Sequence, residues 1–228
     1  KIEKFNGRYL LKKAKDSQKD QTYMLYGFTQ QQLKHTLMPL GDYSKKEIRK
    51  MAKEMNFSVH DKPDSQEICF VPDNDYTRFL DENYPEIAEK GPILDTAGNK
   101  LGEHDALYNY TVGQRKGLGI SAPHPLYVLK LDQQKNAVIV GEDKEVYFKG
   151  LITEHVNYIS VPKLTRKRTA LVKIRYNCPA FKAELIPVTE NKIKVIFDEK
   201  QRAVTPGQSV VFYDDTTVIG GEIIKTAI

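Results

Sequence analysis

The first 85 residues of the chain place hydrophobic residues at helical spacing. One helix is predicted from Thr22 to His35, with Asp20 as its N-cap. A capping box at Ser44–Glu47 predicts a second, amphipathic helix that ends near Asn56. A third and shorter helix is expected over Asp75–Asn83, and Pro85 would stop it. The N-terminal third is therefore predicted to be mainly helical.

After Pro85 the pattern changes to short runs rich in Val, Ile, Phe and Tyr, separated by turn residues. The turn at 95–99 predicts a hairpin, and a polar run joins two further strands at 126–131 and 137–140. Five more strands are predicted towards the C-terminus, at 169–176, 181–187, 192–197, 209–213 and 218–224. This regular spacing favours a small antiparallel barrel, since closure removes exposed strand edges. The change of period places a domain boundary near residues 146–150.

The net charge is +5, and it is distributed unevenly. From Gly150 to Ile228 there are 12 Lys and Arg residues but only 8 Asp and Glu residues, whereas the preceding part is nearly balanced. A basic excess in one region favours a polyanion as partner. A solvated basic face with no such partner explains the charge equally well.

The chain has two cysteines, Cys69 and Cys178. Two cysteines make no disulfide framework, which favours a reducing cytoplasm. Cys69 lies in the heptapeptide Asp64–Phe70, between a polar and an apolar run. It is either a small buried hydrophobe or a sulfur nucleophile. The chain has no run of about 18 apolar residues that could span a membrane. It does not begin with Met, so we expect a piece of a longer polypeptide.

Other candidate sites are sparse. The five histidines are scattered, and neither cysteine has a CxxC partner, so no metal site is predicted. The segment Gly113–Gly119 is basic and rich in glycine. It could let the backbone approach a phosphate closely, or it could be a flexible turn, which the sequence alone favours.

Five motifs occur in order along the chain: KDQTYML at 19–25, PLG at 39–41, KPDSQEICF at 62–70, YTVGQRKGLG at 110–119, and PGQSVVFY at 206–213. Together they resemble the bacterial tRNA-specific 2-thiouridylases, which thiolate the wobble uridine of certain tRNAs. The resemblance covers essentially the whole chain. Members of this family begin with a PP-loop nucleotide domain and a first catalytic cysteine, and this chain contains neither motif. The resemblance therefore implies that ATP binds to an N-terminal domain outside this chain, which alone we expect to be inactive.

The resemblance assigns the chemistry to Cys69. In the family this cysteine receives a persulfide from a sulfur-relay protein, and ATP activates the uracil carbonyl at ring position 2. The persulfide sulfur then attacks, AMP leaves, and the two catalytic cysteines end as a disulfide. A persulfide suits this step because it is a better nucleophile at neutral pH than a thiol with a pKa of about 8.5. Cys178 matches no family requirement and is interpreted as structural or incidental.

The resemblance also implies three tRNA contacts. Lys19, Asp20 and Gln21 match a tRNA-contacting stretch at a helix start, which could instead be a plain helix cap. The pair Arg175–Tyr176 matches a second contact, where Arg can bind phosphate and Tyr can stack on a base. The pair could instead be one exposed and one buried residue of an ordinary strand. Gln208 matches a third contact and could otherwise be a turn residue.

We therefore expect an α+β fold with three parts. Residues 1–70 would be the C-terminal, helical remnant of an α/β nucleotide domain carrying the sulfur-bearing cysteine, 71–147 a small mixed central domain, and 148–228 a C-terminal antiparallel β-barrel that binds tRNA. The expected function is ATP-dependent sulfur transfer to tRNA. The main alternative is a non-catalytic RNA-binding module that retains Cys69. A third is a different PP-loop enzyme acting on a small acid, which the basic C-terminal region disfavours.

Overall fold

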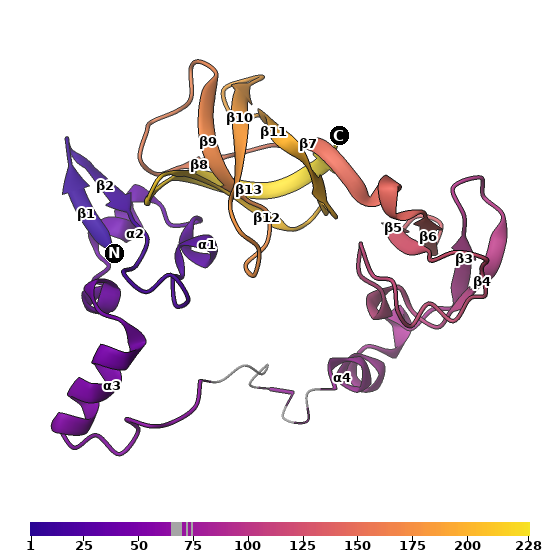
Figure 1. Ribbon diagram of the computed structural model, residues 1–228, viewed down its shortest axis with the longest axis horizontal. Helices are drawn as coiled ribbons and strands as arrows, with labels where there is room; N and C mark the ends of the chain where they lie inside the picture. The colour runs from indigo at the N-terminus through magenta and orange to yellow at the C-terminus, as the bar shows by residue number, and fades with distance from the viewer. Residues whose placement is uncertain (65–69, 72, 74) are drawn as a thin grey trace. The chain divides into compact units, whose positions relative to one another are not determined.

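The computed structural model describes residues 1–64, 70–71, 73 and 75–228 (Figure 1). They form two compact units, and each is considered by itself. The first unit joins Lys1–Pro63 to Lys149–Ile228, and the second is Asp64–Phe148. Both contain helices and sheet, which confirms the predicted α+β class. Within this described part of the chain, no helix combines the length and apolar character needed to cross a membrane.

The first unit begins with a hairpin of β1 (Ile2–Phe5) and β2 (Arg8–Leu11). The strands are antiparallel, with Ile2 opposite Leu11. Asn6 and Gly7 connect them, and both have positive φ angles, 46° and 79°. Asn-Gly is the dipeptide that two-residue hairpin turns of this kind favour, because both central positions need left-handed backbone.

The predicted single helix at 22–35 is wrong, because the chain forms two short helices there. They are α1 (Thr22–Leu25) and α2 (Gln30–Lys34). Thr29 and Gln32 form a capping box that starts a new helix at α2. Gln21, not Asp20, is the N-cap of α1, and no side chain caps that helix. A 3-10 turn, η1 (Pro39–Asp42), follows α2.

The second predicted helix is confirmed as α3 (Lys45–Glu54). Its capping box is the expected one: the Ser44 hydroxyl accepts from the Glu47 amide, and the Glu47 carboxylate accepts from the Ser44 amide. These bonds to the Ser44 amide and a salt bridge from Lys15 lower the pKa of Glu47 to about 2. The helix stops before Asn56, which has left-handed backbone (φ 57°).

The C-terminal part of the first unit is a closed six-stranded barrel, confirming the predicted architecture. Around the ring the order is β12, β9, β10, β11, β7, β13, and back to β12. Hairpin neighbours such as β9–β10, β10–β11 and β12–β13 pair antiparallel. The strands are β7 (Tyr147–Thr153), β8 (Asn157–Tyr158), β9 (Arg168–Lys173), β10 (Phe181–Pro187), β11 (Ile193–Arg202), β12 (Ser209–Asp214) and β13 (Thr217–Ala227), with β8 pairing outside the ring on β13.

One predicted strand is too long. We expected a strand over 169–176, but β9 ends at Lys173, so Arg175 and Tyr176 lie in the connection to β10. A turn forms there because the Cys178 amide and thiol both donate to the Arg175 carbonyl, at 3.4 Å and 3.1 Å. Pro179 follows and offers no backbone donor to continue a strand ladder.

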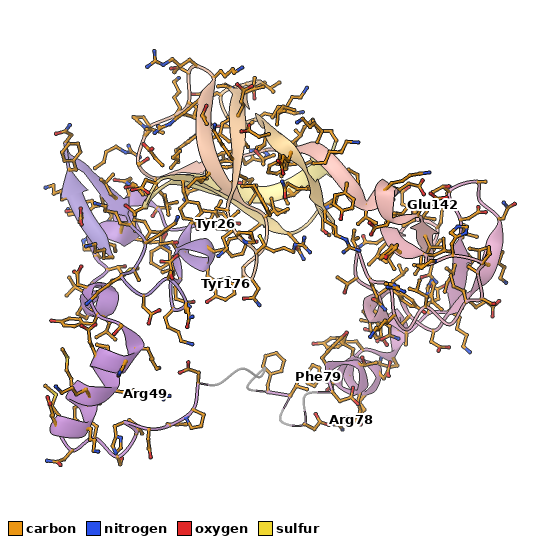
Figure 2. All side chains as sticks on the ribbon, in the orientation of Figure 1. Tyr26, Arg49, Arg78, Phe79, Glu142 and Tyr176 are labelled. Atoms are coloured by element: carbon orange, nitrogen blue, oxygen red, sulfur yellow. The ribbon has the colours of Figure 1, made fainter. Side chains whose placement is uncertain are left out.

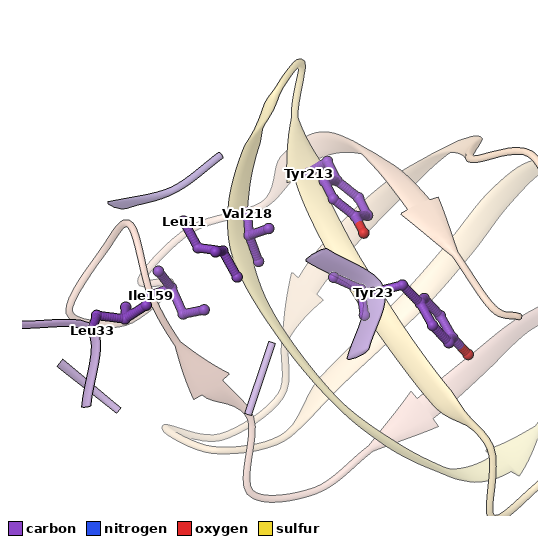
Figure 3. Close-up of a cluster of buried hydrophobic side chains, with 7 residues drawn as sticks. Leu11, Tyr23, Leu33, Ile159, Tyr213 and Val218 are labelled. Carbon is purple, nitrogen blue, oxygen red and sulfur yellow. The ribbon is translucent and has the colours of Figure 1, made fainter. Parts of the chain in front are cut away.

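A buried cluster fixes the N-terminal segment to the barrel (Figure 3). Its members come from the hairpin, from α1 and α2, and from the barrel strands; they are Leu11, Tyr23, Leu33, Ile159, Val211, Tyr213 and Val218. None is more than 6% exposed. Burial of a large apolar side chain contributes about 1.5–3 kcal/mol, so this cluster is a substantial part of the unit's stability.

The second unit contains α4 and a small mixed sheet. Helix α4 (Tyr76–Asn83) confirms the third predicted helix, and the Asp75 carboxylate caps it by accepting from the Arg78 amide. In the sheet the order is β4, β3, β6, β5, with β3 and β6 parallel and the outer pairs antiparallel. Its core is Ile93, Leu118, Val128, Val138 and Val140. The remaining elements are η2 (Pro85–Ile87), β3 (Gly91–Leu94), β4 (Lys100–His104), η3 (Leu107–Asn109), β5 (Tyr127–Asp132), β6 (Ala137–Gly141) and η4 (Asp143–Val146).

Candidate nucleic-acid interface

Three sequence segments meet at one edge of the barrel. They are the start of α1, the β9–β10 connection, and the start of β12. The Gln21 side-chain amide donates to the Tyr176 hydroxyl at 2.8 Å, and the Tyr23 hydroxyl donates to the Ser209 carbonyl at 2.8 Å. The structure thus brings together predicted contact residues that lie 155 positions apart. We call this surface the tyrosine edge; its residues are Lys19, Asp20, Gln21, Tyr23, Lys173, Arg175, Tyr176, Gln208 and Ser209.

Tyr176 is the exposed aromatic ring of the tyrosine edge, with 37% of its surface accessible. Figure 2 shows it with Tyr26 on the side of the barrel where α1 lies. Its ring centroid is 6.1 Å from that of buried Tyr23, at an interplanar angle of 59°. The Lys173 ammonium lies 5.5 Å from the Tyr176 centroid and 5.7 Å from the Tyr23 centroid. An aromatic face beside an ammonium can stack on a base and attract a phosphate.

The hydroxyls beneath this ring are neutral donors rather than titrating groups. Burial raises the pKa of Tyr23 well above its usual range, and burial raises that of Tyr213 to about 12. The Thr22 and Tyr213 hydroxyls are 3.2 Å apart, and Tyr26 meets the Ser209 hydroxyl at 3.0 Å. At neutral pH the Tyr23 and Tyr213 hydroxyls therefore carry no charge.

Asp20 turns inward from the surface. Its carboxylate accepts from the Ala14 amide at 2.9 Å and from the Thr22 hydroxyl. Both oxygens are therefore occupied in shaping the turn into α1. Lys19 and Gln21 on either side are exposed. The predicted phosphate site at a helix start has weak physical support here, because α1 is only four residues long. Any contact from this stretch would come from the Lys19 and Gln21 side chains.

Arg175 is half-buried and partly fixed. Its Nη2 donates to the Arg202 carbonyl at 2.7 Å, while its buried Nε has no acceptor among the residues that the structure describes. One edge of the guanidinium is thus committed to the barrel. The fork of five N–H donors leaves capacity for an oxyanion.

Gln208 has a fixed backbone and an unengaged side chain. Its amide donates to Thr205 at 3.2 Å, and its carbonyl accepts from Ile224 at 2.7 Å. The preceding Gly207 has a φ of 89°, which only glycine adopts at little cost. No acceptor or donor for the Gln208 side-chain amide occurs in the described part of the chain.

Cys69 lies outside the described residues. Among the residues that follow it in the sequence, the exposed Phe70 ring lies 5.5 Å from that of Phe79, and Asp73 forms a salt bridge with Arg78 at 2.5 Å. Among the described residues, no three His, Cys, Asp or Glu side chains gather as metal ligands. Sequence reasoning missed Lys173 and Tyr23, although each lies two positions from a predicted contact residue. That proximity in sequence does not identify them, because only the fold shows that Lys173 and Tyr23 both lie beside the Tyr176 ring.

Comparison with known proteins covers almost the entire chain. Three family models match in order: the tRNA methyl transferase HUP domain over residues 1–73, the tRNA methyl transferase PRC-barrel domain over 77–142, and the Aminomethyltransferase beta-barrel domain over 148–224. The tRNA-specific 2-thiouridylase MnmA of Halothermothrix orenii is 63% identical over 220 residues, which is 96% of this chain and 62% of that protein.

Two further relatives have the same description. The tRNA-specific 2-thiouridylase MnmA of Symbiobacterium thermophilum is 51% identical over 99% of this chain and 58% of its own length. That of Acetivibrio thermocellus is 51% identical over 96% of this chain and 61% of its own length. The chain therefore spans about three fifths of the length of the curated relatives it matches.

Proposed function

This chain belongs to the tRNA-specific 2-thiouridylase family, and from that premise we propose that the complete polypeptide containing it transfers sulfur to position 2 of the wobble uridine in tRNA. The observation that supports a tRNA-holding role for this part is the joining of two segments at the tyrosine edge, where Gln21 bonds to Tyr176 at 2.8 Å. Exposed Lys19, Gln21 and Tyr176 with half-buried Lys173 and Arg175 supply the cations and the aromatic face that RNA recognition uses.

In this proposal Cys69 carries the sulfur. A sulfur-relay protein delivers a persulfide to its thiol, and the terminal sulfur attacks C2 of the uracil. ATP, bound by a domain outside this chain, supplies the adenylyl group that turns the C2 oxygen into a leaving group. A second cysteine, also outside this chain, then takes the Cys69 sulfur as a disulfide and leaves the transferred sulfur on C2. The carbonyl oxygen departs with AMP. The sulfane sulfur takes up the two electrons released when the two cysteines form the disulfide, so no external oxidant is needed.

In this proposal the complete enzyme acts in the cytoplasm, and three segments of this chain have separate roles. Residues 1–70 would form the C-terminal part of the nucleotide domain and carry the sulfur-bearing cysteine, 71–147 would form the central domain, and 148–228 would hold the tRNA body. Within the last segment, Arg175 provides the phosphate contact, Tyr176 the stacking surface and Gln208 a polar contact. Just before α1, Lys19 and Gln21 complete the tRNA-binding stretch, in which Asp20 shapes the turn.

The test is Cys69→Ser in the complete polypeptide. Serine cannot carry a sulfane sulfur, so thiolation should disappear while tRNA and ATP binding remain. Thiolated uridine would be quantified by mass spectrometry of digested tRNA. Cys178→Ser is the matched control, since a hydroxyl can still donate to the Arg175 carbonyl that the thiol reaches at 3.1 Å. Substantial thiolation by Cys69→Ser would refute the sulfur-carrier role and leave an RNA-binding module as the alternative.

A further inference from the structure

The second unit has a basic hollow that the proposed function does not use. It has a volume of about 430 Å³ and lies along the loop between η3 and β5. We call it the glycine hollow. Its lining consists of Arg115, Gly117, Leu118, Gly119, Ile120, Ala122, Pro123, His124, Pro125 and Leu126.

Two kinds of contact define the conformation of the loop: hydrogen bonds from the Gln114 side chain and the burial of Leu118. The Gln114 side chain accepts from the Thr111 amide at 2.9 Å and donates to the Lys116 carbonyl at 3.0 Å. Leu118 is only 6% exposed and belongs to the core of the mixed sheet. The glycines beside it, Gly117 and Gly119, have φ angles of 74° and 67°. The turn that the sequence favoured is present, because the Gln114 amide donates to the Thr111 carbonyl at 2.9 Å, and these contacts define the conformation of the loop that follows it.

The backbone of this loop presents free donors. The N–H groups of residues 115–119 have no acceptor within the described ranges of the chain. Successive amides around left-handed glycines form concavities that bind anions. Unsatisfied amides at a glycine-rich loop are the donors that commonly approach phosphate oxygens, because no Cβ obstructs them.

The charged side chains of the loop also form no salt bridge with the residues that the structure describes. Neither Arg115 nor Lys116 has a carboxylate partner among the described residues, and both are exposed. His124 adds a third group that can carry positive charge. Glu142, labelled in Figure 2, is already paired with Lys144 at 2.7 Å, and this bond, with a smaller effect of His124, lowers its pKa. The local field therefore favours an anion.

We propose that the glycine hollow binds a phosphodiester of the RNA backbone, with the guanidinium of Arg115 and the amides of residues 115–119 as donors. This proposal rests on the proposed function, since it adds a second contact to the same tRNA. The chemistry would suit any phosphate, including that of a free nucleotide. RNA is favoured because Arg115, Lys116, Gly117 and Gly119 are all exposed, whereas small-ligand sites bury most of their ligand.

The experiment combines binding with amide shifts. Binding of unmodified tRNA to this chain would be titrated at several salt concentrations for the wild type, Arg115→Gln, Arg115→Lys and Lys135→Gln. Lys135 is the matched control, because it is exposed on the β5–β6 turn of the same unit and does not line the hollow. Arg115→Gln should bind tRNA about tenfold more weakly, as expected for one charge-assisted contact. It should also reduce the slope of log affinity against log salt by about one unit. Arg115→Lys should keep that slope.

In parallel, the amide resonances of residues 115–119 would be followed on addition of tRNA, inorganic phosphate or ATP. Shifts with tRNA support the proposal. Shifts with ATP or phosphate but none with tRNA would overturn it in favour of a free nucleotide or anion. Equal behaviour of Arg115→Gln and Lys135→Gln would also overturn it. In that case, a loss of binding in Arg175→Ala would show that the proposed function survives; failure of the wild type to bind tRNA would instead count against the proposed function itself.

Discussion

The tyrosine edge and the glycine hollow would contact the same kind of ligand through different parts of the polypeptide. At the tyrosine edge, side chains would contact the RNA. Gln21, Tyr23 and Arg175 are each fixed there by a hydrogen bond to another segment. At the glycine hollow, the contacts would come from backbone amides and exposed cations, while Gln114 and Leu118 hold the loop to its own unit. A substitution removes a side-chain contact, whereas the backbone N–H donor remains after any substitution except one to proline. The two surfaces should therefore respond differently to mutation.

The largest contrast should come from Gly221→Ala and Gly119→Ala. A Cβ at Gly221 would lie 2.6 Å from the Tyr26 ring and 2.7 Å from the Val210 carbonyl, directly behind the tyrosine edge. We expect a loss of about 3 kcal/mol in unfolding free energy from this overpacking. At Gly119 nothing lies within 4 Å, and the φ of 67° alone should cost about 1–2 kcal/mol.

Urea unfolding followed by circular dichroism measures both losses. Gly27→Ala is the control, because Gly27 has neither a close neighbour nor a positive φ, and it should change stability little. Equal losses for Gly221→Ala and Gly119→Ala would contradict the close approach of the backbone at Gly221.

A second contrast uses alkaline pH. Burial raises the folded-state pKa of Tyr213 from 10.0 to about 12, so the unfolded chain loses this proton first as pH rises. The stabilisation from this group is complete below pH 10 and is lost as pH rises to about 12. The loss should reach about 2–3 kcal/mol. Tyr213→Phe should show a shallower alkaline decline in unfolding free energy than the wild type. Parallel curves would mean that Tyr213 ionises freely in the folded protein.

The third prediction separates charge from stacking at the tyrosine edge. Arg175→Ala should weaken tRNA binding by roughly 1–3 kcal/mol and flatten the salt slope by about one unit, because one phosphate contact is lost. Tyr176→Ala should weaken binding without changing the slope, because stacking releases no counterions. Titrations at several salt concentrations measure both quantities. Three identical curves for the wild type and both variants would place the tRNA contact elsewhere.

The smallest effect concerns the bond between Gln21 and Tyr176. Tyr176→Phe keeps the ring but removes the hydroxyl that accepts from Gln21 at 2.8 Å. Because this bond is exposed, its loss should weaken tRNA binding by about 0.5–1 kcal/mol. A double-mutant cycle with Gln21→Leu should show that the two changes are not additive. Full additivity would show that the bond does not orient the ring for RNA.

The features that could be predicted from sequence are those encoded by neighbouring residues. The Ser44–Glu47 capping box, the short helix after Asp75 and the regularly spaced barrel strands depend on spacings of a few positions, and the structure has all of them. The split between α1 and α2 was missed because the hydrophobic period continues across it. Only the second capping box, at Thr29 and Gln32, marks the interruption.

The joining of residues from distant segments could not be predicted in the same way. Spacing gave no reason for Gln21 to meet Tyr176, or for Lys173 to lie beside two tyrosine rings. These contacts depend on the closure of the barrel and on the early end of β9. The glycine loop shows the reverse case: its residues were evident, but its conformation depends on Leu118 reaching the core of the mixed sheet.

The buried cluster that joins Leu11 to Val218 also has a consequence for synthesis on the ribosome. Leu11 and Leu33 emerge early, but their partners in β12 and β13 are translated only after the whole second unit. At about 5–20 residues per second, the first leucine waits roughly 10–40 s for the last strand. During that interval the apolar surface of the N-terminal hairpin and α2 lacks the barrel strands that cover it in the folded unit. Placing the barrel segment earlier along the gene would shorten that wait.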